Sequence, residues 1–346
     1  MNLLRKINSR TIITGIIIAS IVTGGIVGLY YLSSHNLGLP DYKVITDFEG
    51  RNVTIPYEVN RVVVLESYDI VYALGQWDKV VGISKYAYSN PILVAADEQY
   101  NFNLTDVPSP GSSFSVNIEE LVLEDPEVVI AYASSHMQDI LPQIEALNIS
   151  VVLISLDNLD DLYQCIELLG EIFNVSDRAS EIITYMKKTM DIPSSKTNDL
   201  TIDSKLKMIH LWSSKTKVTG GLGVTNTYIH ISGCINPAVD IKEKYAEVSI
   251  EEIIAWNPDV IVIWGSAKYT PEDILNDTQW QSISAVQNQK VFKYPKLSTW
   301  SPASPLIVLR MGMWAYPDLF TDINFETVSN DLFMNIYGIN DPFEWQ

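Results

Sequence analysis

Two similar segments recur in the chain at a fixed separation. Residues 116–132 and 248–264 align without a gap, at a constant offset of 132 residues. Each copy has a short amphipathic stretch, then Pro126 or Pro258, which cannot continue a helix, and finally a continuous apolar run. Such a run is typical of a strand buried on both faces of a parallel sheet. The repeat therefore predicts two similar α/β lobes in tandem.

One glutamate in each copy is left unexplained by helix capping. Asn117 and Ser249 are the expected N-caps, and a glutamate three residues after each can reach back to the cap. Glu119 and Glu251 remain. Acidic residues suit a helix N-terminus through the macrodipole, which is a sufficient structural explanation for either one alone. Their matched placement also suggests a pair of exposed carboxylates, one per lobe, presented to a two-fold partner.

The composition bounds the class of protein. The chain has 346 residues, enough for two domains, and 47% apolar against 19% charged residues favours well-filled cores. A net charge of −19 argues against a nucleic-acid partner, because phosphate binding needs clustered Lys and Arg. Cys165 and Cys234 have no CxxC neighbours, so a disulfide framework and a structural zinc site are not expected.

The N-terminal segment, residues 1–35, predicts an export or anchoring function. Residues 11–32 are uncharged and long enough to cross a hydrocarbon core, and the three basic residues before them should stay cytoplasmic. A cleaved signal peptide is the alternative, but the run is longer than a usual h-region and lacks a clear cleavage site. No cysteine directly follows, which argues against a lipid anchor. We expect an uncleaved helix that tethers the protein to the outer face of the cytoplasmic membrane.

The remainder of the chain divides around one long helix. A helix over 177–190, opened by Ser176, has no counterpart between consecutive strands of one lobe, and a polar stretch from Pro193 follows it. The segment 85–115 reads as a long, aromatic-rich loop of the kind that is usually functional. We expect an N-terminal lobe at 40–175, a bridging helix with its linker at 176–203, and a C-terminal lobe at 204–346.

Several phrases together resemble the substrate-binding proteins of ABC importers that take up ferric siderophores, haem and cobalamin. The matching sequence segments are 47–53 (DFEGRNV), 61–64 (RVVV), 73–75 (ALG), 80–83 (VVGI), the two repeat copies, and 231–238 (ISGCINPA). The resemblance covers roughly residues 44–340. It implies a class III periplasmic binding protein fold: two Rossmann-like lobes with mostly parallel sheets, joined by one long helix, with the ligand in the cleft between them.

The resemblance also implies partners. Members of this family deliver their ligand to a permease dimer with its ATPase, and one glutamate per lobe docks on basic residues of the two permease subunits. By position these are Glu119 and Glu251, the pair that the repeat had isolated. The protein is then expected to be a monomeric binding protein rather than an enzyme, with a metal chelate, most simply a ferric siderophore, as its ligand.

Ligands of parallel α/β lobes gather at the carboxyl ends of the strands. Large chelates present flat, partly apolar surfaces, so aromatic walls with a few polar contacts suit them. Any one of these aromatic residues could instead belong to the core, and Arg310, on an expected terminal helix, could form a structural ion pair. The candidate ligand-binding residues are Tyr68, Tyr86, Ser113, Phe114, Tyr132, Trp212, Tyr245, Trp264, Trp300 and Arg310.

Other cargoes and functions compete with a siderophore. Cobalamin-binding relatives have aromatic residues at positions matching Tyr132 and Tyr245, but Ser113 falls where they have tryptophan, which weakens that assignment. A bare metal ion would need His136 and His210, which lack paired spacing. An oxyanion such as molybdate could bind backbone N–H groups after the glycine-rich turn 219–223.

Two different classes of function also remain open. The sequence has no nucleophile elbow, phosphate-binding loop, zinc-protease motif or dinucleotide-binding motif, so a tethered hydrolase has no support from motifs. A tethered receptor without transport partners is the other class. A gene beside permease and ATPase genes would favour import over that role.

Overall fold

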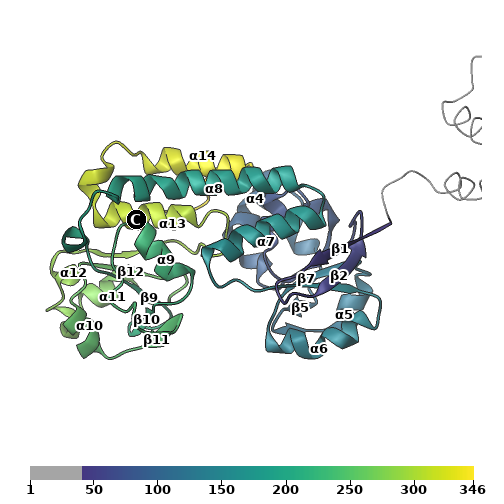
Figure 1. Cartoon of the computed structure of the whole chain (residues 1–346), viewed down its shortest axis with the longest axis horizontal. Helices are drawn as coiled ribbons and strands as arrows, with labels where there is room; N and C mark the ends of the chain where they lie inside the picture. The colour runs from purple at the N-terminus through teal and green to yellow at the C-terminus, as the bar shows by residue number, and fades with distance from the viewer. Residues whose placement is uncertain (1–40) are drawn as a thin grey trace, which may run out of the picture. The chain divides into compact units, whose positions relative to one another are not determined.

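The computed structural model describes residues 41–346, and Val44–Gln346 form one compact unit (Figure 1). The described part opens with a hairpin of β1 (Tyr42–Thr46) and β2 (Asn52–Pro56). Its turn is tied by Asp47, whose buried carboxylate accepts hydrogen bonds from the Arg51 side chain at 2.7 and 3.0 Å and from Leu153 N at 3.2 Å. The DFEGR phrase therefore has a structural function, because it fastens the hairpin to the N-terminal lobe.

The N-terminal lobe is built on a four-stranded sheet, in the order β4-β3-β7-β8. All neighbouring strands are parallel, with Val64 of β3 opposite Ile130 of β7. The apolar runs of the sequence form these strands. Residues of β3, β7 and β8 are almost all buried, as expected for strands covered on both faces, whereas half of the edge strand β4 is only partly buried. The bounds are β3 Val62–Val64, β4 Val80–Ile83, β7 Val128–Tyr132 and β8 Ser150–Ile154.

The C-terminal lobe contains a five-stranded mixed sheet, in the order β11-β10-β9-β12-β13. The three strands β9, β12 and β13 are parallel, whereas β10 is antiparallel to both β9 and β11. The prediction of two α/β lobes with mostly parallel sheets is confirmed. The bounds are β9 Met208–Leu211, β10 Lys217–Thr219, β11 Tyr245–Glu247, β12 Val260–Ile263 and β13 Val291–Lys293.

The repeated segments form equivalent helix–strand units, α5 (Ile118–Leu123) with β7 and α10 (Ile250–Trp256) with β12. Asn117 and Ser249 cap the two helices as predicted. Only the second copy has the reciprocal capping box, in which Glu252 accepts from Ser249 N at 2.8 Å. The first copy differs because the backbone N–H of Asn117 already donates to Pro110 O at 2.8 Å.

The long helix α8 (Ser176–Thr197) passes along both lobes and packs against α7 (Leu159–Ile172), α13 (Pro305–Ala315) and α14 (Phe325–Tyr337) (Figure 1). The sequence predicts that this helix ends before Pro193, and that boundary is wrong. Pro193 is buried inside the helix, close to Gly312 of α13. Packing on α13 thus outweighs the hydrogen bond that a proline removes from the helix.

The segment 85–115, expected to be a long loop, is mostly ordered into short elements. Asn90 accepts hydrogen bonds from Ile92 N and Leu93 N, and Pro91 begins α4 (Pro91–Tyr100), whose Leu93 is fully buried. An Asn cap followed by proline is a typical helix start, so the prediction of a loop here is wrong. The segment also contains the 3₁₀ turns η2 (Ala87–Ser89) and η3 (Leu104–Asp106) and the short strands β5 (Gly111–Ser112) and β6 (Ser115–Val116).

The remaining elements complete the covering layers. They are α3 (Tyr68–Ala73), η1 (Trp77–Lys79), α6 (Ser135–Glu145), η4 (Ile202–Ser204), α9 (Val224–Ile231), α11 (Pro271–Leu275), η5 (Thr278–Trp280), α12 (Ser284–Gln287) and η6 (Pro317–Phe320). The helix α14 was not predicted, although Asn324 caps its start and Gly338, at φ 71°, ends it. No helix within residues 41–346 has the length and apolarity needed to cross a membrane. The predicted anchor, residues 1–35, lies outside the described residues.

Candidate functional site

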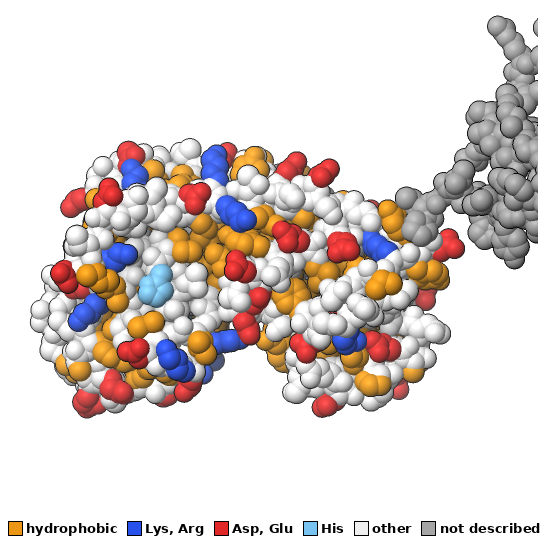
Figure 2. Space-filling view, viewed as in Figure 1, with side chains coloured by type: hydrophobic (Ala, Val, Ile, Leu, Met, Phe, Trp, Pro, Cys, Tyr) orange, Lys and Arg blue, Asp and Glu red, His pale blue; other side chains and the backbone are white. Residues whose placement is uncertain are grey.

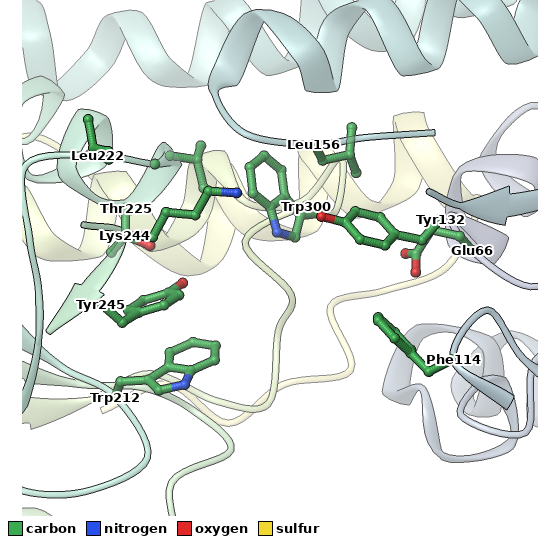
Figure 3. Close-up of a pocket in the computed structure, with 12 residues that line it drawn as sticks. Glu66, Phe114, Tyr132, Leu156, Trp212, Leu222, Thr225, Lys244, Tyr245 and Trp300 are labelled. Atoms are coloured by element: carbon green, nitrogen blue, oxygen red, sulfur yellow. The ribbon is translucent and has the colours of Figure 1, made fainter. Parts of the chain in front are cut away.

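A cavity of about 460 Å³ lies between the two lobes, at the carboxyl ends of their strands (Figure 3). The space-filling view shows a notch between the lobes (Figure 2). The volume lies within the roughly 300–1,000 Å³ typical of small-molecule sites. The lining residues come from both lobes: Glu66, Phe114, Tyr132, Leu156, Trp212, Leu222, Gly223, Val224, Thr225, Lys244, Tyr245 and Trp300.

Three stacked aromatic rings form the C-terminal side of the site. Trp212 directly follows β9, Trp264 directly follows β12, and Tyr245 belongs to β11. The ring of Trp212 stacks on Trp264 at 3.7 Å and on Tyr245 at 4.2 Å between centroids. Elements of the C-terminal sheet thus bring residues from distant parts of the sequence into one aromatic stack, with Trp212 in the middle.

The N-terminal side carries a second aromatic pair, Phe114 and Tyr132, with centroids 5.9 Å apart. Ser113 lies behind this pair and is only 1% exposed. Its hydroxyl accepts from Tyr132 N at 2.9 Å and donates to Leu65 O at 3.4 Å. Ser113 therefore positions the end of β7 and does not line the cavity.

A smaller cavity of about 260 Å³ shares Trp212, Tyr245 and Trp300 with the main one. Tyr68, Tyr86 and Trp264 line it. The Lys296 amine, from the C-terminal lobe, donates to Ser89 O at 3.0 Å in the N-terminal lobe at this margin. The predicted aromatic residues are thus brought together around two adjoining spaces.

Two charged side chains of the described chain line the main cavity, on opposite sides of it (Figure 3). Burial raises the pKa of Glu66 to about 7, the Ser67 N–H opposes this, and the nearby Asp69 adds to it. Burial lowers the pKa of Lys244, but the hydrogen bond and charge of Asp157 leave it above its usual value. Lys244 and Asp157 form an ion pair that links the two lobes.

Arg310 is the candidate that the structure places elsewhere. It lies on α13 over the rings of Trp314 and Phe325, at 5.7 and 4.8 Å, and donates to Gln346 O. It lines a different hollow, with Phe325 and Trp345. These contacts are structural, but within the described residues they are cation–π contacts and a hydrogen bond rather than the ion pair that the sequence suggested.

Sequence reasoning did not select Thr225, Lys244 and Leu156 as site residues. Lys244 is adjacent to Tyr245, and Thr225 directly follows the glycine-rich turn, so both lay beside features already noted. Leu156 follows β8, and an aliphatic residue at that position has nothing in the sequence to distinguish it from a core residue.

The two histidines of the bare-metal alternative have structural partners. His210 is fully buried beneath the site, hydrogen-bonded to Thr219 Oγ1 at 2.9 Å and Tyr294 OH at 3.2 Å, and burial lowers its pKa to about 3. His136 Nε2 accepts from Val116 N at 3.1 Å. Residues 41–346 contain no group of three His, Cys, Asp or Glu side chains suited to a metal ion.

Comparison with known proteins agrees with this architecture. The molybdate-binding protein MolA of Haemophilus influenzae is 27% identical over 339 residues, covering 88% of this chain and 94% of that protein. Its molybdate-bound structure aligns with a TM-score of 0.75 at 26% identity, covering 88% of this chain and 100% of that chain. The vitamin B12-binding protein of Vibrio cholerae is 23% identical, covering 68% of this chain and 81% of that protein.

A further solved structure shows the same fold. Helicobacter pylori CeuE in complex with nickel and histidine aligns with a TM-score of 0.74 at 24% identity, covering 88% of this chain and 100% of that one. The model of the family described as periplasmic binding protein matches residues 62–297, more than half of the chain. The predicted resemblance is confirmed: this chain belongs to the periplasmic binding protein family, the substrate-binding proteins of ABC transporters, which are not enzymes.

Proposed function

We propose that this protein captures a metal chelate, with a ferric siderophore as the first candidate, and delivers it to a membrane permease. The observation that supports this proposal is the cavity of about 460 Å³, which is walled by aromatic side chains from both lobes, among them Tyr245 at one end of the Tyr245–Trp212–Trp264 stack. Flat aromatic surfaces bind the planar, partly apolar arms of a chelate through stacking and burial. A single tetrahedral oxyanion would fill only a small part of this volume.

The protein acts outside the cytoplasm, as its periplasmic and lipoprotein relatives do. We propose that residues 1–35 tether it there as a monomer. We also propose that Glu119 on α5 and Glu251 on α10 dock on the two permease subunits. Both side chains are exposed, and they occupy equivalent positions in the two repeat copies. A two-fold permease would meet one carboxylate from each lobe.

Binding to a panel of ligands tests the chelate proposal. Ferric hydroxamates and catecholates, haem, cobalamin, nickel with histidine, and molybdate would be added to the purified full-length protein while its thermal unfolding is followed. A ligand at 100 times its dissociation constant should add about 2.7 kcal/mol to the free energy of unfolding. We expect the shift with a ferric chelate.

A matched pair of variants then locates the site. Trp212→Ala should weaken binding of the active chelate by about tenfold, because it removes the central ring of the stack. Trp256→Ala removes the same side chain from the same lobe, away from the cavity, and should leave affinity unchanged. Equal affinity in wild type and Trp212→Ala would contradict the proposed site, and a shift with molybdate alone would contradict the proposed cargo.

A free oxyanion is the second candidate. The 27% identity to a molybdate-binding protein favours it, and so does the start of helix α9 at the cavity wall. Backbone N–H groups at a helix start bind anions. The panel distinguishes the two candidates directly.

A further inference from the structure

The glycine-rich turn before α9 is a rigid support at the wall of the main cavity. A Cβ atom on Gly221 would come within 1.9 Å of Val239 O, and one on Gly220 within 2.4 Å of Glu243 O. The turn is held by hydrogen bonds from Gly221 N to Ile241 O at 2.8 Å and from Gly220 N to Lys244 O at 3.1 Å. Only glycine allows this close backbone approach.

A buried asparagine fixes the same turn from behind. Asn236 is 0% exposed, and its amide donates to Thr219 O at 3.2 Å, to Gly220 O at 3.0 Å and to Asn226 Oδ1 at 2.9 Å. Its own Oδ1 accepts from Ala238 N at 3.0 Å. Turn, helix start and following loop are therefore held together before any ligand binds.

The turn places the N-terminus of α9 at the wall of the main cavity. Gly223, Val224 and Thr225 line the space, and no side chain of the described residues caps this helix end. The first N–H groups of a helix lack intrahelical partners and carry partial positive charge. They are thus available to a ligand in the cavity.

Thr225 has a buried hydroxyl group beside this helix start. Its side chain is 2% exposed, yet its hydroxyl completes no hydrogen bond within residues 41–346. The Tyr245 phenol lies near Thr225: burial raises the pKa of Tyr245, and the Thr225 side chain partly opposes that rise. A buried hydroxyl without a partner is unfavourable unless a ligand supplies one.

The charged groups of the cavity also favour an anion near the start of α9. Thr225, Lys244 and Tyr245 lie on one side, and Glu66 lies on the other (Figure 3). An anionic group would therefore be attracted to the α9 side, and Glu66 would repel it whenever that carboxyl is ionised. Lys244 and Asp157 are both exposed to solvent, and water screens their attraction, so the pair is weak enough for the amine to turn to an anion in the cavity.

We infer that the N-terminus of α9, the Thr225 hydroxyl and the Lys244 amine form an anion subsite within the ligand cavity. Its ligand is an oxyanion group, carried by a chelate as a free carboxylate or present as a tetrahedral oxyanion. The inference builds on the proposed function by naming a polar group of the cargo. Asn236 is a positioning residue for this subsite.

Calorimetric titration of the full-length protein tests the inference. The probes are molybdate alone, ferric citrate, which carries carboxylates, and the uncharged hydroxamate ferrichrome. Thr225→Val should weaken binding of whichever anionic probe binds the wild type by roughly tenfold or more, because one hydrogen bond to a charged group is lost. Binding of ferrichrome should be unchanged if that chelate binds.

Two control variants keep the test specific. Thr225→Ser retains the hydroxyl and should keep wild-type affinity, whereas Thr227→Val makes the same change on the same helix away from the cavity lining and should have no effect. Unchanged melting temperatures would show that each variant is folded. A Thr225→Val variant that loses affinity only through unfolding would be separated in this way from one that loses the subsite.

The outcomes separate the subsite from the chelate proposal. Thr225-dependent binding of molybdate, with no chelate bound, would support the subsite and reject the chelate. Chelate binding that is equal in wild type and Thr225→Val would overturn the subsite and leave the chelate. Failure of the wild type to bind either anionic probe would also overturn the subsite.

Discussion

Glu66 lies at the carboxyl end of β3, where it lines the main cavity next to a buried acid, Asp69. The Glu66 carboxylate accepts from Ser67 N at 3.1 Å, but burial raises its pKa to about 7. Burial raises the pKa of Asp69 to about 6, against hydrogen bonds from Ser301 and from backbone N–H groups. Both acids therefore favour the protonated form more strongly in the folded protein than in the unfolded chain.

This environment predicts a pH dependence of stability. The folded-state pKa of Glu66 is above the unfolded value, so its contribution is fully present below about pH 4.5 and is lost as pH rises through about 7. Replacing it with glutamine should reduce the fall in unfolding free energy between pH 5 and 8 by about 2–3 kcal/mol. Urea unfolding of wild type and Glu66→Gln at the two pH values measures this.

The control for this prediction is Glu98→Gln, an exposed acid on α4 for which no such difference is expected. Parallel stability–pH curves for wild type and Glu66→Gln would show that Glu66 is ionised as readily in the folded state as in the unfolded one. The prediction would then be wrong.

At the scale of elements, the two repeat units present matched surfaces. The helices α5 and α10 each place one glutamate in the first turn, Glu119 and Glu251, exposed and away from the cavity lining. Neither carboxylate accepts a hydrogen bond from the N-cap residue of its helix, so capping does not account for either one. Docking on a partner with two equivalent basic sites would explain why both helices have an exposed glutamate at this position.

Charge reversal of both glutamates tests this docking function. The double variant Glu119→Lys/Glu251→Lys should abolish import in cells, because like charges would then oppose at both docking sites, while ligand affinity in vitro stays unchanged. The control is Glu98→Lys/Glu272→Lys, with one exposed acid from each lobe on α4 and α11. Normal uptake by the first double variant would remove the docking function.

At the scale of the whole described unit, one arginine ties three helices together. Arg178, in the first turn of α8, donates to Ala73 O of α3 at 3.1 Å, and to Asn335 O and Ile336 O of α14 at 2.9 and 2.7 Å. The carbonyl groups at helix ends lack intrahelical partners, so this side chain satisfies groups of two other helices at once.

Removal of this connection should destabilise the protein. Arg178→Met keeps much of the side-chain length but leaves the carbonyls without their donor, so we expect a loss of about 1–3 kcal/mol in unfolding free energy. The midpoint of urea unfolding would report it. Lys188→Met, an exposed position on the same helix, should change stability by less than about 0.5 kcal/mol. Equal effects of the two variants would contradict the proposed connection.

The sequence by itself determined the elements whose signals are local. Two gapless copies predicted the units α5–β7 and α10–β12, since capping residues, a terminating proline and a continuous apolar run are all read within a few turns of chain. The same locality explains why Trp212 and Tyr132 were identified as site candidates. Each ends or follows a strand that the sequence predicts, and strand ends define the ligand edge of a parallel sheet.

Only the tertiary structure decided what depends on contacts between distant segments. Packing of Pro193 against α13 extended the long helix past a residue that normally ends one. Ser113, expected to bind ligand, proved to hold β7 in place, and Arg310 lies outside the cavity. Thr225 lines the cavity because Asn236 fixes the turn ahead of it. Local sequence specifies which elements form, whereas the side chains that face one another are set by packing free energy summed over the folded chain.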